Sequence, residues 1–295
     1  MSLDLVLVNP GGPQSTYQGL APVLTAFEPP VWVGLLAGFA RLRGLRVEVI
    51  DANALSLTPD ETARRVGELA PVLTAVVVYG HQPSASTQNM PAARAVCEAL
   101  AWSQPHLKTL LVGGHVAALP ERTLREEPVT FVADGEGPYT IAALIDTLKS
   151  RAPDYGKVPG LLYWGGDHII RNPPAPLVTD LDREMPGNAW SMLPMARYRA
   201  HNWHCLDGSN RQPYAAIYTT LGCPYHCEFC CIQSPFKSGE RATSQKEAGV
   251  SLIETLESYG VTPEVRRSFS IEPKEESRLE LWVGVLIQTL LPLII

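Results

Sequence analysis

The first 150 residues alternate short apolar runs with helical patterns, and this alternation constrains the fold more than any other feature. Each apolar run has the length of a buried strand, and the segments between the runs have the spacing of helices. Strands that alternate with helices form a parallel sheet covered by helices on both faces. We therefore predict an α/β fold with a doubly wound, parallel, five-stranded sheet. The predicted strands are residues 3–8, 46–50, 74–79, 109–112 and 129–133.

Two of the predicted helices have clear end signals. Thr58 is a capping residue, Pro59 follows it, and Glu61 stands three residues after the cap, which predicts a capping box. Gly44 follows the helical pattern of residues 31–43, and glycine is the residue that most often ends a helix. Both signals fall between predicted strands, as the alternating pattern requires.

Glycines follow four of the five predicted strands. In an open parallel sheet the loops after the strands share one edge, and ligands bind beyond the carboxyl ends of the strands. Glycine lets the backbone approach a ligand closely and leaves amides free to bind it. Each glycine alone could simply make a turn, but the set favours a ligand-binding edge. The glycines are Gly11, Gly12, Gly80, Gly113, Gly114, Gly135 and Gly137.

A second feature is a group of three cysteines, Cys223, Cys227 and Cys230, with the spacing C-x3-C-x2-C. Three thiolates on one short loop can hold three irons of a cubane cluster and leave the fourth iron open to a ligand. A structural zinc loop that uses His226 or Cys231 is an alternative, although zinc sites usually come as paired C-x2-C knuckles. Packing alone is the third possibility.

The cysteine motif resembles that of radical S-adenosylmethionine enzymes, with Phe229 as the aromatic residue before the third cysteine. The resemblance implies that Cys223, Cys227 and Cys230 ligate a [4Fe–4S] cluster whose open iron binds S-adenosylmethionine. It also implies that Phe229 lies near the adenine of that cofactor. Electron transfer, from a donor such as a flavodoxin or ferredoxin, would then generate a 5′-deoxyadenosyl radical.

The glycine-edged region resembles the N-terminal cobalamin-binding domain of one branch of these enzymes, a flavodoxin-like or Rossmann-like fold. The resemblance covers residues 1–145 and rests on Asn9-Pro10, Glu28-Pro29-Pro30, Gly113-Gly114-His115, Pro120 and Asp134-Gly135-Glu136-Gly137. No G-x-G-x-x-G dinucleotide motif or P-loop lysine motif is present. The cobalamin contacts that the resemblance implies are Gly11, Gly12, Gly80, Ser84, Gly113, Gly114, His115, Gly135, Glu136 and Gly137.

The sequence departs from many cobalamin domains because it lacks D-x-H-x-x-G, the motif whose histidine ligates cobalt. His81 and His115 are the two imidazoles on the predicted ligand edge. We expect no histidine below the cobalt, and we expect His115 to contact the loop or a phosphate.

The predicted domains are a cobalamin-binding domain over residues 1–150, a linker with a hairpin over 151–212, and the start of a radical S-adenosylmethionine barrel over 213–295. In the linker, Trp190, Trp203 and Tyr198 could line a substrate cavity, but we expect them to fix the linker to the domain surface. The first barrel strand is predicted at residues 214–220. A six-unit barrel needs on the order of 150–200 residues, and 83 follow residue 212. We therefore expect a truncated barrel, with the apolar tail 281–295 a frameshift product or a membrane anchor.

We expect this chain to be a cobalamin-dependent radical S-adenosylmethionine enzyme, a methyltransferase or cyclase acting on a small molecule. The alternatives are a cobalamin-binding or carrier module with a non-functional barrel, and a zinc-stabilised interaction protein. The net charge of −6 favours neither nucleic acid nor an anionic membrane as partner. Six cysteines, three of them in a ligand loop, favour a reducing compartment. The start of the chain lacks a secretion signal pattern, so we expect a cytoplasmic location.

Overall fold

The structure is a computed structural model that describes residues 3–11, 27–80, 83–185, 187–199, 212–216, 218, 220–228, 230–237 and 239–243. All of these belong to one compact unit, Met1–Thr255. The side chains of Pro83 and Ser84 are not described. The apolar tail 281–295 lies outside the described residues.

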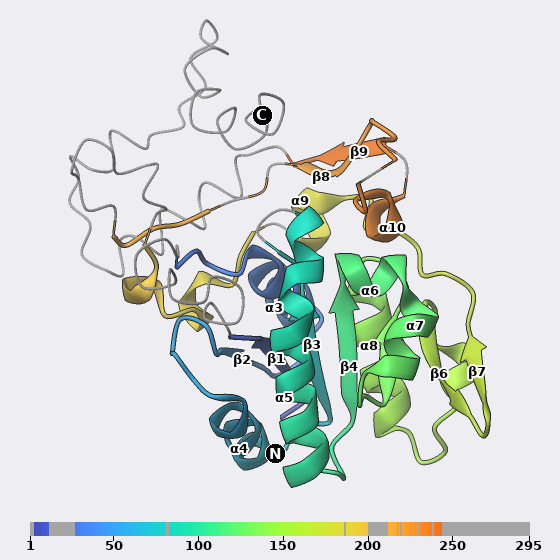
Figure 1. Ribbon diagram of the computed structural model, residues 1–295. Helices are drawn as coiled ribbons and strands as arrows, with labels where there is room; N and C mark the ends of the chain where they lie inside the picture. Colours follow the sequence, from blue (N-terminus) through green and yellow to red (C-terminus); the bar gives the residue numbers. More distant parts are fainter. Residues whose placement is uncertain are drawn as a thin grey trace, which may run out of the picture. The chain divides into compact units, whose positions relative to one another are not determined.

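A seven-stranded sheet organises the described residues, with the strand order β2-β1-β3-β4-β5-β6-β7 (Figure 1). The first five strands are parallel to one another, as predicted. The strands are β1 (Leu5–Asn9), β2 (Val47–Asp51), β3 (Leu73–Val78), β4 (Thr109–Gly113), β5 (Phe131–Ala133), β6 (Leu161–Gly165) and β7 (His168–Arg171).

The hairpin that we assigned to the linker is part of this sheet. Strand β6 pairs antiparallel with β5, and β7 pairs antiparallel with β6. An unpaired strand edge exposes backbone donors and acceptors, so a hairpin that covers β5 satisfies them. Arg171 in β7 then donates two hydrogen bonds to one carboxylate oxygen of Asp134, at 2.9 and 2.6 Å, and fixes the hairpin to the loop after β5.

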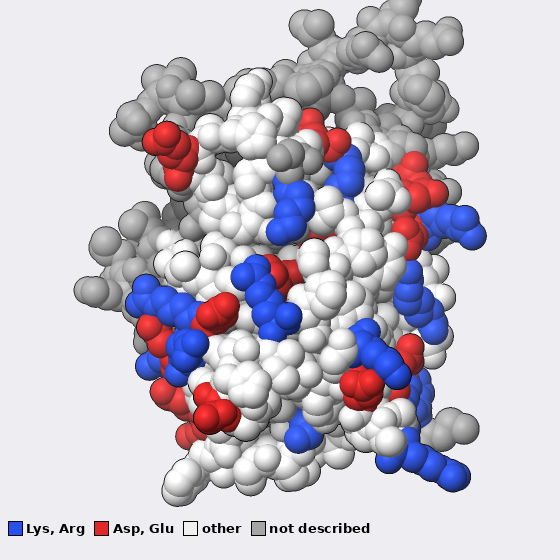
Figure 2. Space-filling view, turned by 90° about the vertical axis from the view of Figure 1, so that its right-hand side faces the viewer, with Lys and Arg blue, Asp and Glu red and all other residues white. Residues whose placement is uncertain are grey.

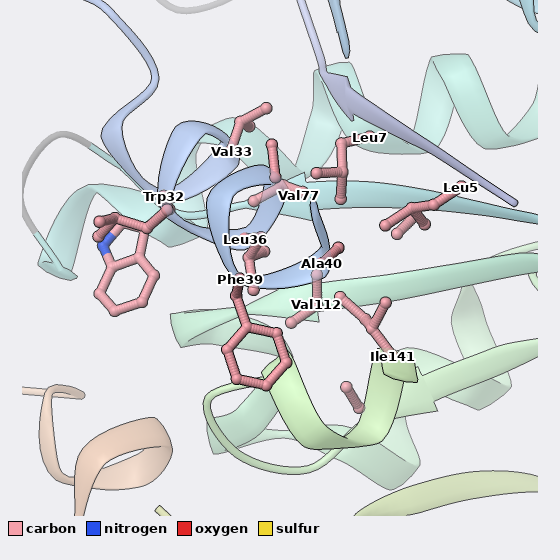
Figure 3. Close-up of a cluster of buried hydrophobic side chains, with 14 of the residues drawn as sticks. Leu5, Leu7, Trp32, Val33, Leu36, Phe39, Ala40, Val77, Val112 and Ile141 are labelled. Atoms are coloured by element: carbon pink, nitrogen blue, oxygen red, sulfur yellow. The ribbon is translucent and has the colours of Figure 1, made fainter. Parts of the chain in front are cut away.

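Helices cover both faces of the sheet. The capping box of Thr58 and Glu61 is present at the start of α4, as predicted. Strand β1 is buried on both sides, because Leu5 and Leu7 enter one apolar cluster and Val6 enters the other. Figure 3 shows the first cluster, between α3, α8 and the sheet. The helices are α3 (Val31–Leu42), α4 (Pro59–Leu69), η2 (Pro83–Asn89), α5 (Met90–Ser103), α6 (Gly114–Ala118), α7 (Pro120–Glu126) and α8 (Pro138–Lys149).

The segment after β7 packs closely on the sheet domain. Trp190 and Tyr198 are fully buried in a third cluster with Ala54. These two aromatic residues fix the linker to the domain, as expected, and Trp203 lies outside the described residues. This segment contains the short helices α9 (Leu181–Glu184), η4 (Trp190–Met192) and η5 (Met195–Arg197). Another short helix, η3 (Tyr155–Lys157), lies between α8 and β6.

The three cysteines belong to a small antiparallel hairpin of strands β8 (Thr220–Cys223) and β9 (Gly239–Ala242): Cys223 ends β8, and Cys227 and Cys230 lie in the connection to β9. A short helix, α10 (Gln233–Phe236), lies between the two strands in the chain. The prediction of a strand over residues 214–220 was wrong: of its described residues, only Thr220 belongs to a strand. The backbone of Tyr214 instead bonds to Tyr198 in the linker, so this segment follows the linker.

Charged residues of both signs are interspersed on the face shown in Figure 2, with uncharged surface between them. None of the helices among the described residues has both the length and the apolar character that crossing a membrane requires.

Candidate functional site

The predicted edge residues come together at the carboxyl ends of the parallel strands. Gly11 follows β1, Gly80 follows β3, and Gly113 ends β4. Gly114 and His115 open α6, while Gly135, Glu136 and Gly137 lie between β5 and α8. Gly12 and His81 lie outside the described residues, and of Ser84 only the backbone, in η2, is described.

Gly113 is a site of close backbone approach. A Cβ atom added to Gly113 would lie 2.1 Å from the carbonyl oxygen of Val78 in the neighbouring strand. The Ser86 hydroxyl also donates a hydrogen bond to this carbonyl oxygen. The same hydroxyl accepts a 2.9 Å hydrogen bond from the backbone N–H of His115. The absence of a side chain therefore lets β3, β4 and the next loop meet at the edge.

The loop after β5 has glycines for a different reason. Gly135 has φ +131° and Gly137 has φ +103°, which side chains other than glycine rarely adopt. A Cβ added to Gly137 would lie 2.5 Å from a methyl group of Val112, whereas one added to Gly135 would meet no heavy atom within 4 Å. Gly135 is thus buried but has free space where a side chain would lie, and this fits a binding edge.

His115 is half-buried on the same edge. Its Nδ1 atom lies 3.0 Å from the Thr87 hydroxyl oxygen, which joins the loop after β3 to the start of α6. Burial, with the nearby Arg122, lowers the pKa of His115, so the imidazole is largely neutral at pH 7. These contacts agree with the expected role of His115 in the loop.

A buried carboxylate closes the other side of the edge. Asp51, the last residue of β2, accepts hydrogen bonds from the Tyr198 hydroxyl at 2.6 Å and from the Asn9 amide at 2.8 Å. Burial raises the pKa of Asp51, and these hydrogen bonds oppose the rise. Tyr198 comes from the linker, so this cluster fixes the linker beside β1 and β2.

Glu136 points into the protein. Its carboxylate accepts a 2.9 Å hydrogen bond from the backbone N–H of Val178 and forms an ion pair with Arg241 of β9. Arg241 also donates to the carbonyl oxygen of Val178. The edge loop, the linker and the cysteine hairpin therefore meet at one carboxylate.

Three features of the site were not predicted from the sequence: Arg241, Tyr198 as a partner of Asp51, and the inward orientation of Glu136. Arg241 and Glu136 are 105 residues apart, and no local pattern links residues at that separation. One signal was available: an acid between two glycines of a buried loop needs a cationic or hydrogen-bonding partner.

The cysteines occupy the turn that follows β8. Cys223 ends β8, Cys227 is exposed, and Cys230 is half-buried. The backbone N–H of Cys230 donates to the carbonyl oxygen of Cys227 at 3.1 Å. The amide of Gln233 donates to the carbonyl oxygens of Cys223 and Tyr225, at 2.9 and 2.6 Å, and so fixes the course of the loop.

Among the described residues, no three His, Cys, Asp or Glu side chains lie close enough together to hold a metal ion. The donor set of three thiols on one eight-residue loop nevertheless suits a soft metal or an iron–sulfur cluster. Phe229 lies outside the described residues. The loop thus has the chemistry for a cluster, although its thiols are not gathered around one point.

Residues 18–145 match the protein family described as the B12 binding domain. The chain carries a B12-binding domain. This match spans the glycine-edged loops after β3, β4 and β5.

Two curated relatives extend the comparison. An uncharacterized methyltransferase, PH0819, from Pyrococcus horikoshii is 28% identical over 260 residues, 88% of this chain and 52% of the relative. An anaerobic magnesium-protoporphyrin IX monomethyl ester cyclase from Synechocystis is 27% identical over 68% of this chain and 38% of the relative. The chain thus spans about half or less of the length of these relatives.

Two solved structures share the fold. OxsB, described as a cobalamin-dependent S-adenosylmethionine radical enzyme with aqua-cobalamin and S-adenosylmethionine bound, superposes with a TM-score of 0.64. That match is 17% identical and covers 89% of this chain and 33% of OxsB. TsrM from Kitasatospora setae, a radical S-adenosylmethionine methyltransferase with cobalamin and a [4Fe–4S] cluster bound, has a TM-score of 0.58 at 18% identity. That match covers 88% of this chain and 47% of TsrM.

Proposed function

We propose that this chain functions as a cobalamin-dependent radical S-adenosylmethionine enzyme, a methyltransferase or cyclase acting on a small molecule. One observation carries the proposal. The hairpin that bears the three cysteines contacts, through Arg241, the glycine loop at the edge of the B12-binding sheet. The relatives with methyltransferase and cyclase names support the reaction type.

The residues of this chain would hold and orient the cofactors. Cys223, Cys227 and Cys230 would ligate the cluster, and Phe229 would lie near the adenine of S-adenosylmethionine. Gly135 and the other edge loops would receive cobalamin, while buried Tyr198 and Asp51 exclude water from one side of the edge. When bound, these cofactors supply radical formation and methyl or electron transfer, which protein side chains alone do not provide.

The proposed function also requires an electron donor, a reducing location and two cofactor-binding domains. A small, strongly reducing protein such as a flavodoxin or ferredoxin would supply the electron, and the cytoplasm would keep the thiols reduced. Residues 1–150 would form the B12-binding domain, 151–212 the linker, and 213–295 the start of the radical S-adenosylmethionine domain.

Anaerobic reconstitution with iron and sulfide tests the cysteine assignment. The wild-type chain should gain iron, sulfide and a broad visible absorption band, and Cys223→Ala should lose most of each, because the cluster would lose a ligand. Cys97→Ala is the matched control, since Cys97 is buried in α5, away from the cysteine loop. The iron content of the Cys97→Ala protein should equal that of the wild type. Equal iron in Cys223→Ala and the wild type would contradict the assignment.

A carrier module is the second candidate, because the described residues contain no gathered metal site. The reconstituted chain should form 5′-deoxyadenosine when S-adenosylmethionine and dithionite are added. Cobalamin binding without this product would favour the carrier. Zinc without iron after anaerobic purification would favour a zinc-stabilised interaction protein.

A further inference from the structure

Glu136 is almost fully buried, and other parts of the chain contact both of its carboxylate oxygens. It accepts from the backbone N–H of Val178 and pairs with the guanidinium of Arg241, whose side chain is 16% exposed. Arg241 belongs to β9, where it pairs in register with Leu221 of β8, two residues before Cys223. The ion pair therefore joins the cysteine hairpin directly to the loop after β5.

An aromatic stack reaches the same loop from α10. Phe236 stacks on Trp32 with ring centroids 5.0 Å apart, and Trp32 stacks on Tyr79 at 4.3 Å. The Tyr79 hydroxyl donates to the backbone carbonyl oxygen of Glu136 at 3.2 Å. Burial and the Glu136 charge raise the pKa of Tyr79, which keeps this hydroxyl protonated and able to donate.

A third contact lies beyond β9. The Thr243 hydroxyl donates to the carboxylate of Asp182, in α9, at 2.6 Å. The hairpin and its helix thus bond to or stack on the rest of the unit at these three places, in addition to the packing of α10 against α6. Figure 1 shows them beyond the carboxyl end of β4. Two of these three places, the ion pair and the aromatic stack, converge on Glu136.

We propose that Glu136 and Arg241 are positioning residues that dock the cysteine hairpin onto the carboxyl edge of the B12-binding sheet. This inference rests on the proposed function for its purpose, which is to hold the cluster loop at a fixed reach from bound cobalamin. It also changes the role expected for Glu136: the residue holds the two cofactor-bearing parts together and does not itself contact cobalamin.

The energetics of a buried ion pair favour a positioning role. Taking two charges out of water offsets much of their attraction, so such a pair adds little net stability compared with apolar side chains. Removing one partner, however, leaves an uncompensated buried charge and is strongly unfavourable. A pair of this kind defines one docked arrangement and penalises the others.

Hydrogen exchange on the full chain, without cofactors, tests the docking. In Arg241→Met, peptides from residues 220–243 should exchange faster by about tenfold or more, because the hairpin opens more often. Peptides from β3 should keep their wild-type protection, which shows that the sheet domain is folded. Arg241→Lys keeps the charge, so the exchange rate of its residues 220–243 should lie between those of the wild type and Arg241→Met.

Arg171→Met is the matched control. Arg171 pairs with Asp134, a buried carboxylate of the same loop, but it comes from β7, and this ion pair does not involve the cysteine hairpin of β8 and β9. Its loss should leave exchange in residues 220–243 within about twofold of the wild type. Equal exchange of the hairpin in Arg241→Met and the wild type, or equal acceleration in both arginine variants, would overturn the proposal.

A second measurement addresses the purpose of the docking. After loading with iron, sulfide and hydroxocobalamin, Arg241→Met should bind both groups as the wild type does. After reduction with dithionite, the magnetic coupling between Co(II) and the reduced cluster should nevertheless weaken, and Arg241→Lys should restore part of it. Unchanged coupling in Arg241→Met would refute the positioning role. If the wild type loads neither group, the proposed function falls, while hydrogen exchange still decides the docking.

Discussion

Replacement of Gly113 by alanine tests the close approach of β3 and β4 at the candidate edge. The added Cβ would lie 2.1 Å from the carbonyl oxygen of Val78 and 2.5 Å from its carbonyl carbon. Gly113 itself is extended, with φ 160° and ψ 177°, so the substitution adds no conformational strain. The cost is therefore steric, and it falls on backbone that moves only if the two strands separate.

The size of the effect follows from this geometry. Overpacking of a buried site costs about 1–3 kcal/mol, and each strand hydrogen bond that is lost adds about 1 kcal/mol. We expect Gly113→Ala to lower the free energy of unfolding by about 2–4 kcal/mol in urea titrations followed by circular dichroism. Binding of hydroxocobalamin should weaken in the same variant.

Gly67→Ala is the matched control. Its Cβ would also meet an atom closely, at 2.4 Å, but that atom is the side-chain amide nitrogen of Gln104, which can rotate away. Gly67 lies in α4, where alanine is favoured over glycine by about 1 kcal/mol. This variant should be as stable as the wild type or more so. A Gly113→Ala protein as stable as Gly67→Ala would refute the steric reasoning.

Two further predictions concern buried carboxylates. Tyr198→Phe removes a hydrogen bond to buried Asp51 and should destabilise the chain by about 1.5–3 kcal/mol in urea titrations; an unchanged midpoint would contradict this. Burial raises the pKa of Asp4, but the backbone N–H of Arg46 and the Lys149 and Arg46 side chains outweigh it, and the pKa falls from 3.8 to about 2. A lowered carboxyl pKa stabilises the folded chain above pH 4, and this stabilisation is lost as the pH falls towards 2. The difference in unfolding free energy between the wild type and Asp4→Asn should therefore shrink by about 2 kcal/mol between pH 5 and pH 2. A constant advantage across that range would contradict the shift.

Local patterns predicted the sheet domain well. Apolar runs identified the five parallel strands, and the hairpin expected in the linker is present as β6 and β7. Thr58 and Glu61 identified a capping box. Each of these features depends on residues close together in the chain, which is why the sequence alone reveals them.

The parts that the sequence did not predict depend on distant contacts. The segment around Tyr214 has a strand-like composition, but its backbone bonds to the linker. Tyr198 and Asp51 are 147 residues apart, and the inward orientation of Glu136 depends on Arg241. The glycines lie at the predicted edge. Gly113 must be glycine because a Cβ there would clash with the carbonyl oxygen of Val78, and this contact exists only when β3 and β4 are paired.

The binding of hydroxocobalamin to Gly135→Gln tests the central claim most directly. Gly135 and Gly166 both have positive φ angles, +131° and +76°, and a Cβ on either would meet no atom within 4 Å. Gly166 lies in the β6–β7 turn, away from the candidate edge, so Gly166→Gln also places a side chain on a glycine of positive φ and serves as the matched control.

If cobalamin binds at the carboxyl edge, the wild type and Gly166→Gln should bind hydroxocobalamin with similar affinity. Gly135→Gln should bind at least about tenfold more weakly, a loss of about 1.4 kcal/mol, because its side chain occupies the approach to the edge. Equal binding by both variants, or no binding by the wild type, would contradict the account.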